Sequence, residues 1–303
     1  MQSTRQIRRQ IQSIKNTSQI TKAMEMVAAS KMKKGQEAAL MARPYAEAAL
    51  HILQSVSESV ESSKHTLLEN REVNNVCILI VSSDKGLCGG LNSGVIREAL
   101  KVIEKYKGKN ISVITVGKKA ENFFRKANKI IASFSGIGDT VELKETLPIS
   151  KVILDDFINN KFDRVIAIYT NFVSTIRQEA KVKKLLPVTR RSIEETIEEI
   201  EDMAINKKDN ATERNNGVEY KFEPSAEEVL CKLLPNLIET QVYHIILESN
   251  ASEHSARMVA MKNATDNAME ILGDLKLSYN YIRQQKITQE ISEISAGVAA
   301  QEN

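Results

Sequence analysis

The chain has 303 residues, of which 42% are hydrophobic and 27% are charged, with a formal net charge of +3. This composition excludes a chain that is disordered throughout, and no stretch approaches the roughly 18 uninterrupted apolar residues that a membrane-spanning helix needs. The first residues are polar and charged, so we expect no secretory signal there. The three cysteines are odd in number and scattered, which favours a reducing compartment and no disulfide framework.

The first expected element is a long N-terminal helix over residues 1–60. Its first 34 residues contain neither Gly nor Pro, and they are rich in good helix formers. Ile7, Ile11 and Ile14 recur at spacings of four and three, which places them on one helical face. We expect this stripe to continue through three apolar residues, and a partner helix to approach closely over four alanines. These residues are Ile20, Met24, Val27, Ala23, Ala28, Ala29 and Ala38. Pro44 predicts a kink or a local break.

The same segment is strongly basic. Residues 1–34 carry eight Lys or Arg side chains against a single acid, Glu25. Such an arm suits nucleic acid or an acidic protein surface, while the simpler alternative is a solvated helix face. No aromatic side chains are interleaved with these charges, which argues against nucleic-acid binding.

Residues 72–188 predict an α/β domain. Residues 76–82 form a short, continuous apolar run, typical of a buried strand, and a Gly-rich loop follows it. Further elements are expected as helices at 93–106, 118–127 and 148–159 and as strands at 111–116, 129–134, 164–172 and 176–186. This alternation of strands and helices predicts a Rossmann-like domain with a mostly parallel sheet.

The Gly-rich loop is the strongest candidate for ligand chemistry in this domain. Gly86, Gly89 and Gly90 lie between a strand and a helix, which is where phosphates are held in many α/β proteins. Their spacing matches neither the dinucleotide-binding pattern nor the P-loop, so the alternative is a structural turn with unusual backbone angles. Cys88 in the same loop is either a reactive thiol at a helix start or, more simply, a small buried residue.

No other pattern points to catalysis. The four histidines lie far apart and none is spaced with a cysteine as metal ligands are, so we expect no metal site. These are His51, His65, His244 and His254. The carboxylate pairs at 155–156 and 194–195 are better explained as solvated helix faces than as acid and base. Residues 189–224 are charged and predict an exposed helix or a loose connector.

The last expected element is a helix within residues 225–303. Between Asn236 and Ala296 there is one Gly and no Pro. Apolar and small residues alternate at spacings of three and four, the pattern of a coiled-coil seam. They are Met258, Met261, Thr265, Ala268, Leu272, Leu275, Tyr279 and Ile282, followed after a slip by Ile287, Ile291, Ile294 and Val298. Antiparallel pairing of the two terminal helices is the simplest way to bury both stripes, while a homodimer and a foreign surface are alternatives.

Four segments resemble the gamma subunit of F-type ATP synthases. Residues 14–31 (IKNTSQITKAMEMVAASK) resemble its N-terminal helix, and residues 83–92 (SDKGLCGGLN) resemble its central loop. Residues 252–268 (SEHSARMVAMKNATDNA) resemble its C-terminal signature, and residues 287–294 (ITQEISEI) the turns that follow. The motifs occur in the family's order and extend over most of the chain.

The resemblance implies a non-catalytic rotor shaft without cofactor or metal. Its antiparallel coiled coil would enter the hexameric ring of alpha and beta subunits, and its globular foot would rest on the ring of c subunits beside epsilon. It would be peripheral to the cell membrane, on the cytoplasmic face. By family position, Met24, Arg257, Gln284 and Thr288 would face the alpha/beta ring or stabilise the shaft. Tyr220, Phe222 and Glu223 would belong to the foot.

Overall fold

We analysed a computed structural model of the chain. The structure describes residues 4–59, 66–127, 129–138, 141–189, 223 and 225–301. It divides into two compact units, which are described separately below. The first combines Met1–Ala29 with Arg257–Asn303, and the second is Ser30–Ala256.

The elements follow the order that the sequence predicts. They are α1 (Thr4–Ser59), β1 (Asn75–Val81), α2 (Leu91–Lys105), β2 (Asn110–Val116), α3 (Lys118–Phe124), η2 (Arg125–Ala127), β3 (Ile130–Phe134), α4 (Leu143–Ile158), β4 (Arg164–Phe172), β5 (Gln178–Leu186) and α6 (Ala226–Gln301). The bounds of α1 enclose Pro44, so the local break expected there is absent from this helix. Among the helices that the structure describes, none is long and apolar enough to cross a membrane.

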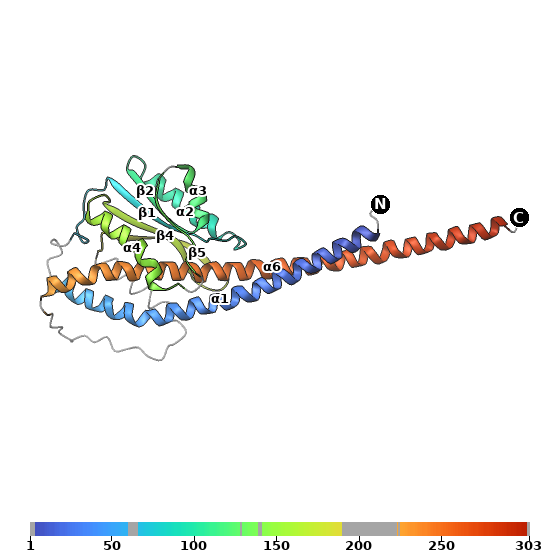
Figure 1. Cartoon of the computed structure of the whole chain (residues 1–303), viewed down its shortest axis with the longest axis horizontal. Helices are drawn as coiled ribbons and strands as arrows, with labels where there is room; N and C mark the ends of the chain where they lie inside the picture. The colour runs from blue at the N-terminus through green and yellow to red at the C-terminus, as the bar shows by residue number, and fades with distance from the viewer. Residues whose placement is uncertain are drawn as a thin grey trace. The chain divides into compact units, whose positions relative to one another are not determined.

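The five strands form one sheet in the order β3-β2-β1-β4-β5 (Figure 1). β1 pairs in parallel with β2 and with β4, and β2 pairs in parallel with β3. Only β5 is antiparallel, joined to β4 by a short hairpin. A mostly parallel sheet with connecting helices is therefore confirmed, together with the two long terminal helices.

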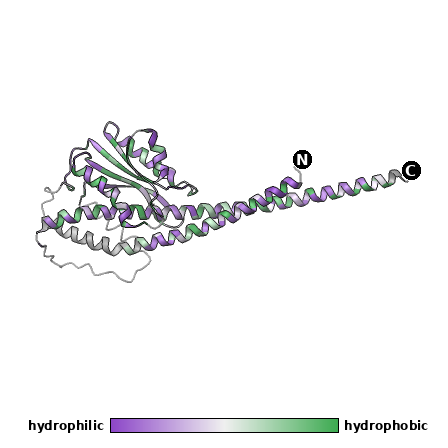
Figure 2. Cartoon of the chain, viewed as in Figure 1, coloured by the Kyte–Doolittle hydropathy of each residue, from purple (hydrophilic) through white to green (hydrophobic). Residues whose placement is uncertain are grey.

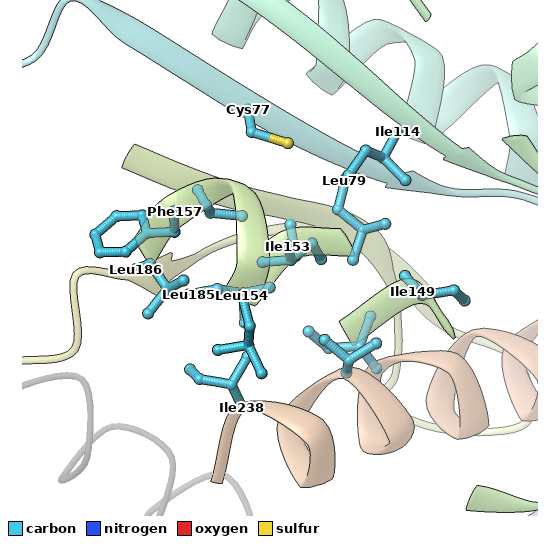
Figure 3. Packing of buried hydrophobic residues seen from close by; sticks show 14 of the residues in the cluster. Cys77, Leu79, Ile114, Ile149, Ile153, Leu154, Phe157, Leu185, Leu186 and Ile238 are labelled. Carbon is cyan, nitrogen blue, oxygen red and sulfur yellow. The ribbon is translucent and has the colours of Figure 1, made fainter. Parts of the chain in front are cut away.

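Helices cover both faces of this sheet, which explains why β1 is apolar throughout. Cys77 and Leu79 point toward α4 and α6, where they join one buried cluster that also includes Val81 (Figure 3). The alternate residues Val76 and Ile78 belong to a second cluster with α2 and α3. A strand with no solvated face needs apolar residues at both parities, and Figure 2 shows the strands as mostly hydrophobic. Burial also raises the pKa of the Cys77 thiol, which keeps it protonated and unreactive.

Helix α4 begins five residues before the predicted start at Pro148. Glu142 and Glu145 form a capping box, in which the Glu142 N–H donates to Glu145 Oε2 at 3.0 Å. This reciprocal pair satisfies backbone donors that the first turn leaves free. The prediction was wrong because it took Pro148 as the helix start, whereas the capping box places the start at Leu143.

Candidate functional surfaces

In the first unit, the buried side chains of α1 and α6 form a coiled-coil seam. On α6, the predicted positions from Met258 to Ile282 are all buried or half-buried, which confirms the pattern read from the sequence. On α1, eight positions with alternating spacings of three and four are buried or half-buried in the same way. They are Thr4, Ile7, Ile11, Ile14, Ser18, Thr21, Glu25 and Ala28. The shared repeat of seven is what keeps two helices in contact over many turns.

One hydrogen bond defines how the two helices are aligned. The hydroxyl groups of Thr21 and Thr265 lie 2.7 Å apart, and the helices run in opposite directions (Figure 1). Counting outward from this pair places Ser18 opposite Ala268 and Ile14 opposite Leu272, which are all seam positions. The two stripes therefore match along their length, and the antiparallel pairing of the terminal helices is confirmed within this unit.

The predicted continuation of the N-terminal stripe is wrong at two positions. Ile20 is 61% exposed and Val27 is 54% exposed, because the seam follows the small residues Thr21 and Ala28 instead. A period of seven keeps the same side of α1 against its partner, while the stripe chosen from large apolar residues turns away from it. Of the four alanines expected to allow close approach, Ala28 is buried, Ala29 and Ala38 are half-buried and Ala23 is exposed.

The outer surface of this unit carries many exposed apolar side chains. On α1 they include Ile20, Met26 and Val27, and on α6 they extend beyond the seam. The α6 members are Met269, Ile271, Leu277, Tyr281, Ile287, Ile291, Ile294 and Val298. Large apolar surface of this kind marks a site of protein contact. The slipped C-terminal stripe is part of this surface, since its four positions are exposed.

The four residues predicted to face the alpha/beta ring or stabilise the shaft occupy different environments. Arg257 is only 8% exposed and Met24 is half-buried, whereas Gln284 and Thr288 are exposed one turn apart on α6. The helix rise separates Arg257 from Gln284 by roughly 40 Å along α6. The structure therefore brings Gln284 and Thr288 together but does not gather all four into one site.

Of the predicted foot residues, Glu223 is described and is exposed. Tyr220 and Phe222 lie outside the described residues. So do residues 190–222 and 224 of the predicted connector.

In the second unit, the Gly-rich loop is closed by its own side chains. The Ser83 N–H donates to Asn92 Oδ1 at 3.1 Å, and Asn92 Nδ2 donates to Cys88 Sγ at 3.2 Å. Cys88 is buried, as the simpler interpretation predicts. Gly89 has a φ of 59°, and Leu87 has a φ of 62° with its side chain exposed. The loop is thus a braced turn that displays Leu87 on the surface.

Gly86 and Gly90, the other two glycines of the loop, do not adopt positive φ. A Cβ added at Gly90 would meet open space, so close packing does not require glycine there.

The carboxyl ends of the central strands are bridged by side chains of the protein itself. This edge is where open α/β sheets usually bind ligands. Here Asp84 accepts hydrogen bonds from the N–H groups of Lys118, at 3.0 Å, and Gly136, at 2.8 Å. Ser82 Oγ accepts from Ala120 N–H at 2.9 Å. These bonds link the segments that follow three strands, and they were missed in the sequence because the partners are far apart along the chain.

A second tight contact lies at the same edge. Gly117 has a φ of 89°, and a Cβ added to it would lie 2.1 Å from the carbonyl oxygen of Ser82. Only glycine fits this backbone conformation and this approach. Across the described parts of the chain, no three His, Cys, Asp or Glu side chains gather as a metal site would require.

His244, like Cys77, is a titratable group of this unit whose pKa is strongly perturbed. Burial of His244, with Lys183 nearby, lowers the pKa of its imidazole to about 4. At neutral pH the ring is therefore uncharged, which burial in apolar surroundings requires. His244 lies on α6, and Lys183 belongs to β5.

Comparison with known proteins relates both units to one family. A family model described as ATP synthase matches residues 3–301. The ATP synthase gamma chain of Roseiflexus sp. (strain RS-1) is 43% identical over 305 residues, which cover 99% of each chain. That of Methylobacillus flagellatus is 42% identical and matches 99% of this chain and 100% of its own.

Solved structures show the same fold. A chain of the central stalk and c-ring of Tetrahymena thermophila mitochondrial ATP synthase superposes with a TM-score of 0.60 at 25% identity, covering 81% of this chain and 99% of that one. A rotor chain of the Euglena gracilis mitochondrial ATP synthase gives a TM-score of 0.59 at 17% identity over 94% of this chain and 98% of its own, a likeness of fold alone. The chain therefore belongs to the ATP synthase gamma chain family, which forms the central stalk of the enzyme.

Proposed function

We propose that this chain is a rotating shaft that couples ion flow through a membrane ring to ATP synthesis or hydrolysis in a surrounding catalytic ring. The observation that carries the proposal is the first unit, where a regular seam holds two helices together while large apolar residues face outward. A helix pair of this kind is complete in itself and still offers contact surface on its outside. Its partners would be alpha and beta subunits around the helices, with epsilon and the c-subunit ring at the second unit.

The shaft contributes no catalytic group of its own in this proposal. The edge of the sheet where a nucleotide would bind is bridged by Ser82 and Asp84, and Gly117 leaves no room beside Ser82. Titration of the isolated chain with ATP, followed by calorimetry, tests this point. We expect no saturable binding, and saturable binding that is lost in D84A would favour a nucleotide-binding α/β protein instead.

The exposed C-terminal part of α6 is proposed to contact the alpha/beta ring, together with Met24, Gln284 and Thr288, while Arg257, which is only 8% exposed, would stabilise the shaft. Deleting residues 287–303 removes apolar residues that are exposed in the chain, so the second unit should remain folded. We expect the truncated chain to melt like the full chain but to support less ATP-driven ion pumping. Unfolding of the second unit on truncation would contradict this division of roles.

The exposed Glu223, with Tyr220 and Phe222, is proposed to belong to the contact with the c ring and epsilon. The location would then be the cytoplasmic face of the cell membrane, where the complex attaches. The decisive experiment is purification of a tagged chain from its own cell membranes. We expect alpha, beta and epsilon subunits to co-purify, and their absence would refute the proposed function.

A further inference from the structure

Three serines on one face of α6 hold this helix to the sheet within the second unit. Ser249, Ser252 and Ser255 are spaced by three residues, so they follow one side of the helix. Ser249 is 9% exposed, and the other two are fully buried. Buried hydroxyl groups need hydrogen-bond partners, and all three find them on the β4–β5 hairpin.

The contacts involve backbone groups near the end of β4 and in the turn that follows. Ser252 Oγ donates to the carbonyl oxygen of Thr170 at 3.2 Å, and Ser249 Oγ accepts from the N–H of Thr170 at 3.4 Å. Ser255 Oγ donates to the carbonyl oxygen of Thr175 at 2.7 Å. Gln178, the first residue of β5, donates to Ser255 Oγ at 3.3 Å.

The strand arrangement explains why serines occur here. The pairing of β4 with β1 ends at Ile168, two residues before Thr170. Beyond that point β4 has no parallel neighbour, and buried backbone groups must still be satisfied. Ser249 supplies the acceptor and Ser252 the donor at this position, so α6 satisfies backbone groups of Thr170.

This contact differs in kind from the one earlier along α6. There Leu234, Ile238 and Val242 pack in the apolar cluster beneath the sheet. Apolar burial resists separation but is non-directional, so it does not by itself select one position of the helix. Hydrogen bonds require a defined distance and angle, and the serine contacts therefore specify the axial and rotational position of α6.

We propose that Ser249, Ser252 and Ser255 form the joint through which the α/β unit and α6 transmit force to each other. From Ser255, α6 continues as one helix to Gln301. The proposal rests on the function as a rotor shaft given above. It assigns the serines a positioning role, distinct from the stability that the apolar cluster provides.

The test uses the complete ATP synthase reconstituted in lipid vesicles with the variant S249A/S252A/S255A. ATP hydrolysis and ATP-driven ion uptake are measured in the same preparation. We expect hydrolysis within about twofold of the natural complex, while ions taken up per ATP fall at least threefold. The matched control is I238V, which trims the apolar cluster without touching a serine and should leave ions per ATP unchanged.

Two results would overturn the joint. One is an unchanged ratio of ions to ATP in an intact triple-variant complex. The other is a parallel fall of hydrolysis and uptake at constant ratio, because that pattern reports lost stability alone. If the triple variant does not assemble, the single variants S255A and S249A replace it. S255A breaks the shortest bond and should lower the ratio more than S249A, and equal ratios in both would refute the proposal.

The same preparation separates failure of the joint from failure of the proposed function. If the natural complex contains this chain and couples normally, and the triple variant is unaffected, only the proposed joint is rejected. Absence of the natural chain from the complex rejects the shaft function itself.

Discussion

The hydrogen bond between Thr21 and Thr265 predicts a measurable coupling between the two terminal helices. Each hydroxyl group has one proton and also lies near a carbonyl oxygen of its own helix, Ser18 for Thr21 at 3.1 Å and Met261 for Thr265 at 2.9 Å. Whichever threonine donates to the other, the second can donate to its own helix. The two protons are thus both used, and loss of either threonine removes the same bond between the helices.

The expected coupling free energy is about 1 kcal/mol, with a range of about 0.5 to 1.5 kcal/mol for a net intramolecular hydrogen bond. It is obtained from the variants T21V, T265V and T21V/T265V. The double-mutant cycle cancels the separate effect of placing valine in the seam, which can itself be stabilising. A coupling of 1 kcal/mol corresponds to about a fivefold change in the local opening equilibrium.

Native-state hydrogen exchange by mass spectrometry is the suitable assay, because it reports opening of the first unit within the intact chain. Peptides from residues 10–29 and 257–280 supply the opening free energies of the two helices. The control cycle pairs T265V with T17V, since Thr17 is exposed and bonds only locally to the carbonyl oxygen of Ser13. A coupling below about 0.3 kcal/mol for Thr21 and Thr265, or an equal coupling in the control cycle, would refute the reasoning.

Three further predictions follow from burial and titration. Ile7→Ala should lower the opening free energy of the first unit by about 2 to 4 kcal/mol in the same exchange assay, because Ile7 is buried in the seam. Ile20→Ala should change this free energy by less than about 0.5 kcal/mol, because Ile20 is exposed. Equal effects of the two variants would contradict the assigned seam. Gly117→Ala should destabilise the second unit by more than about 3 kcal/mol in urea unfolding, because the added Cβ would meet the carbonyl oxygen of Ser82 and φ is positive at this position. An unchanged urea midpoint would disprove this close approach. The pKa of His244, about 4 when folded and about 6.5 when unfolded, means that the unfolded state binds more protons between these values. Its contribution to stability is therefore complete above about pH 6.5 and decreases by about 2 to 3 kcal/mol as the pH falls to about 4. The free energy of unfolding of H244Q in urea should therefore depend less steeply on pH in this range than that of the natural chain. Identical pH dependence in the two proteins would reject His244 as its origin.

The elements of the α/β unit were predictable because their signals are local. β4 was expected at residues 164–172 and occupies Arg164–Phe172, since both of its faces are covered and the run is apolar. α4 was predicted less well, because its start depends on a reciprocal side-chain pair, Glu142 with Glu145, that lies outside the apolar pattern. Apolar periodicity locates an element, while its ends depend on capping contacts.

The seam of the first unit shows where pattern reasoning failed. On α6 the spacing of three and four identified the buried side correctly from Met258 to Ile282, but it was wrong for the slipped stripe from Ile287 to Val298, which is exposed. On α1 the large side chains Ile20 and Val27 were chosen over Thr21 and Ala28, although the smaller residues are the ones buried. A large apolar side chain is a sign of burial in a core that has room for it. Where two helices approach closely, small residues such as Thr21 and Ala28 occupy the contact instead.

The sequence by itself determined the fold class, the order of the strands and helices, the α6 seam and, through four motifs, the family. These depend on spacings and residue types within short segments. Only the tertiary structure decided which face of α1 is buried, which hydroxyl groups align the helices and how Ser249, Ser252 and Ser255 join α6 to the β4–β5 hairpin. Such contacts join residues tens to hundreds of positions apart, and their partners are backbone groups or single hydroxyls. Local periodicity carries no information about them, because they arise only when the packed elements bring their unsatisfied polar groups together.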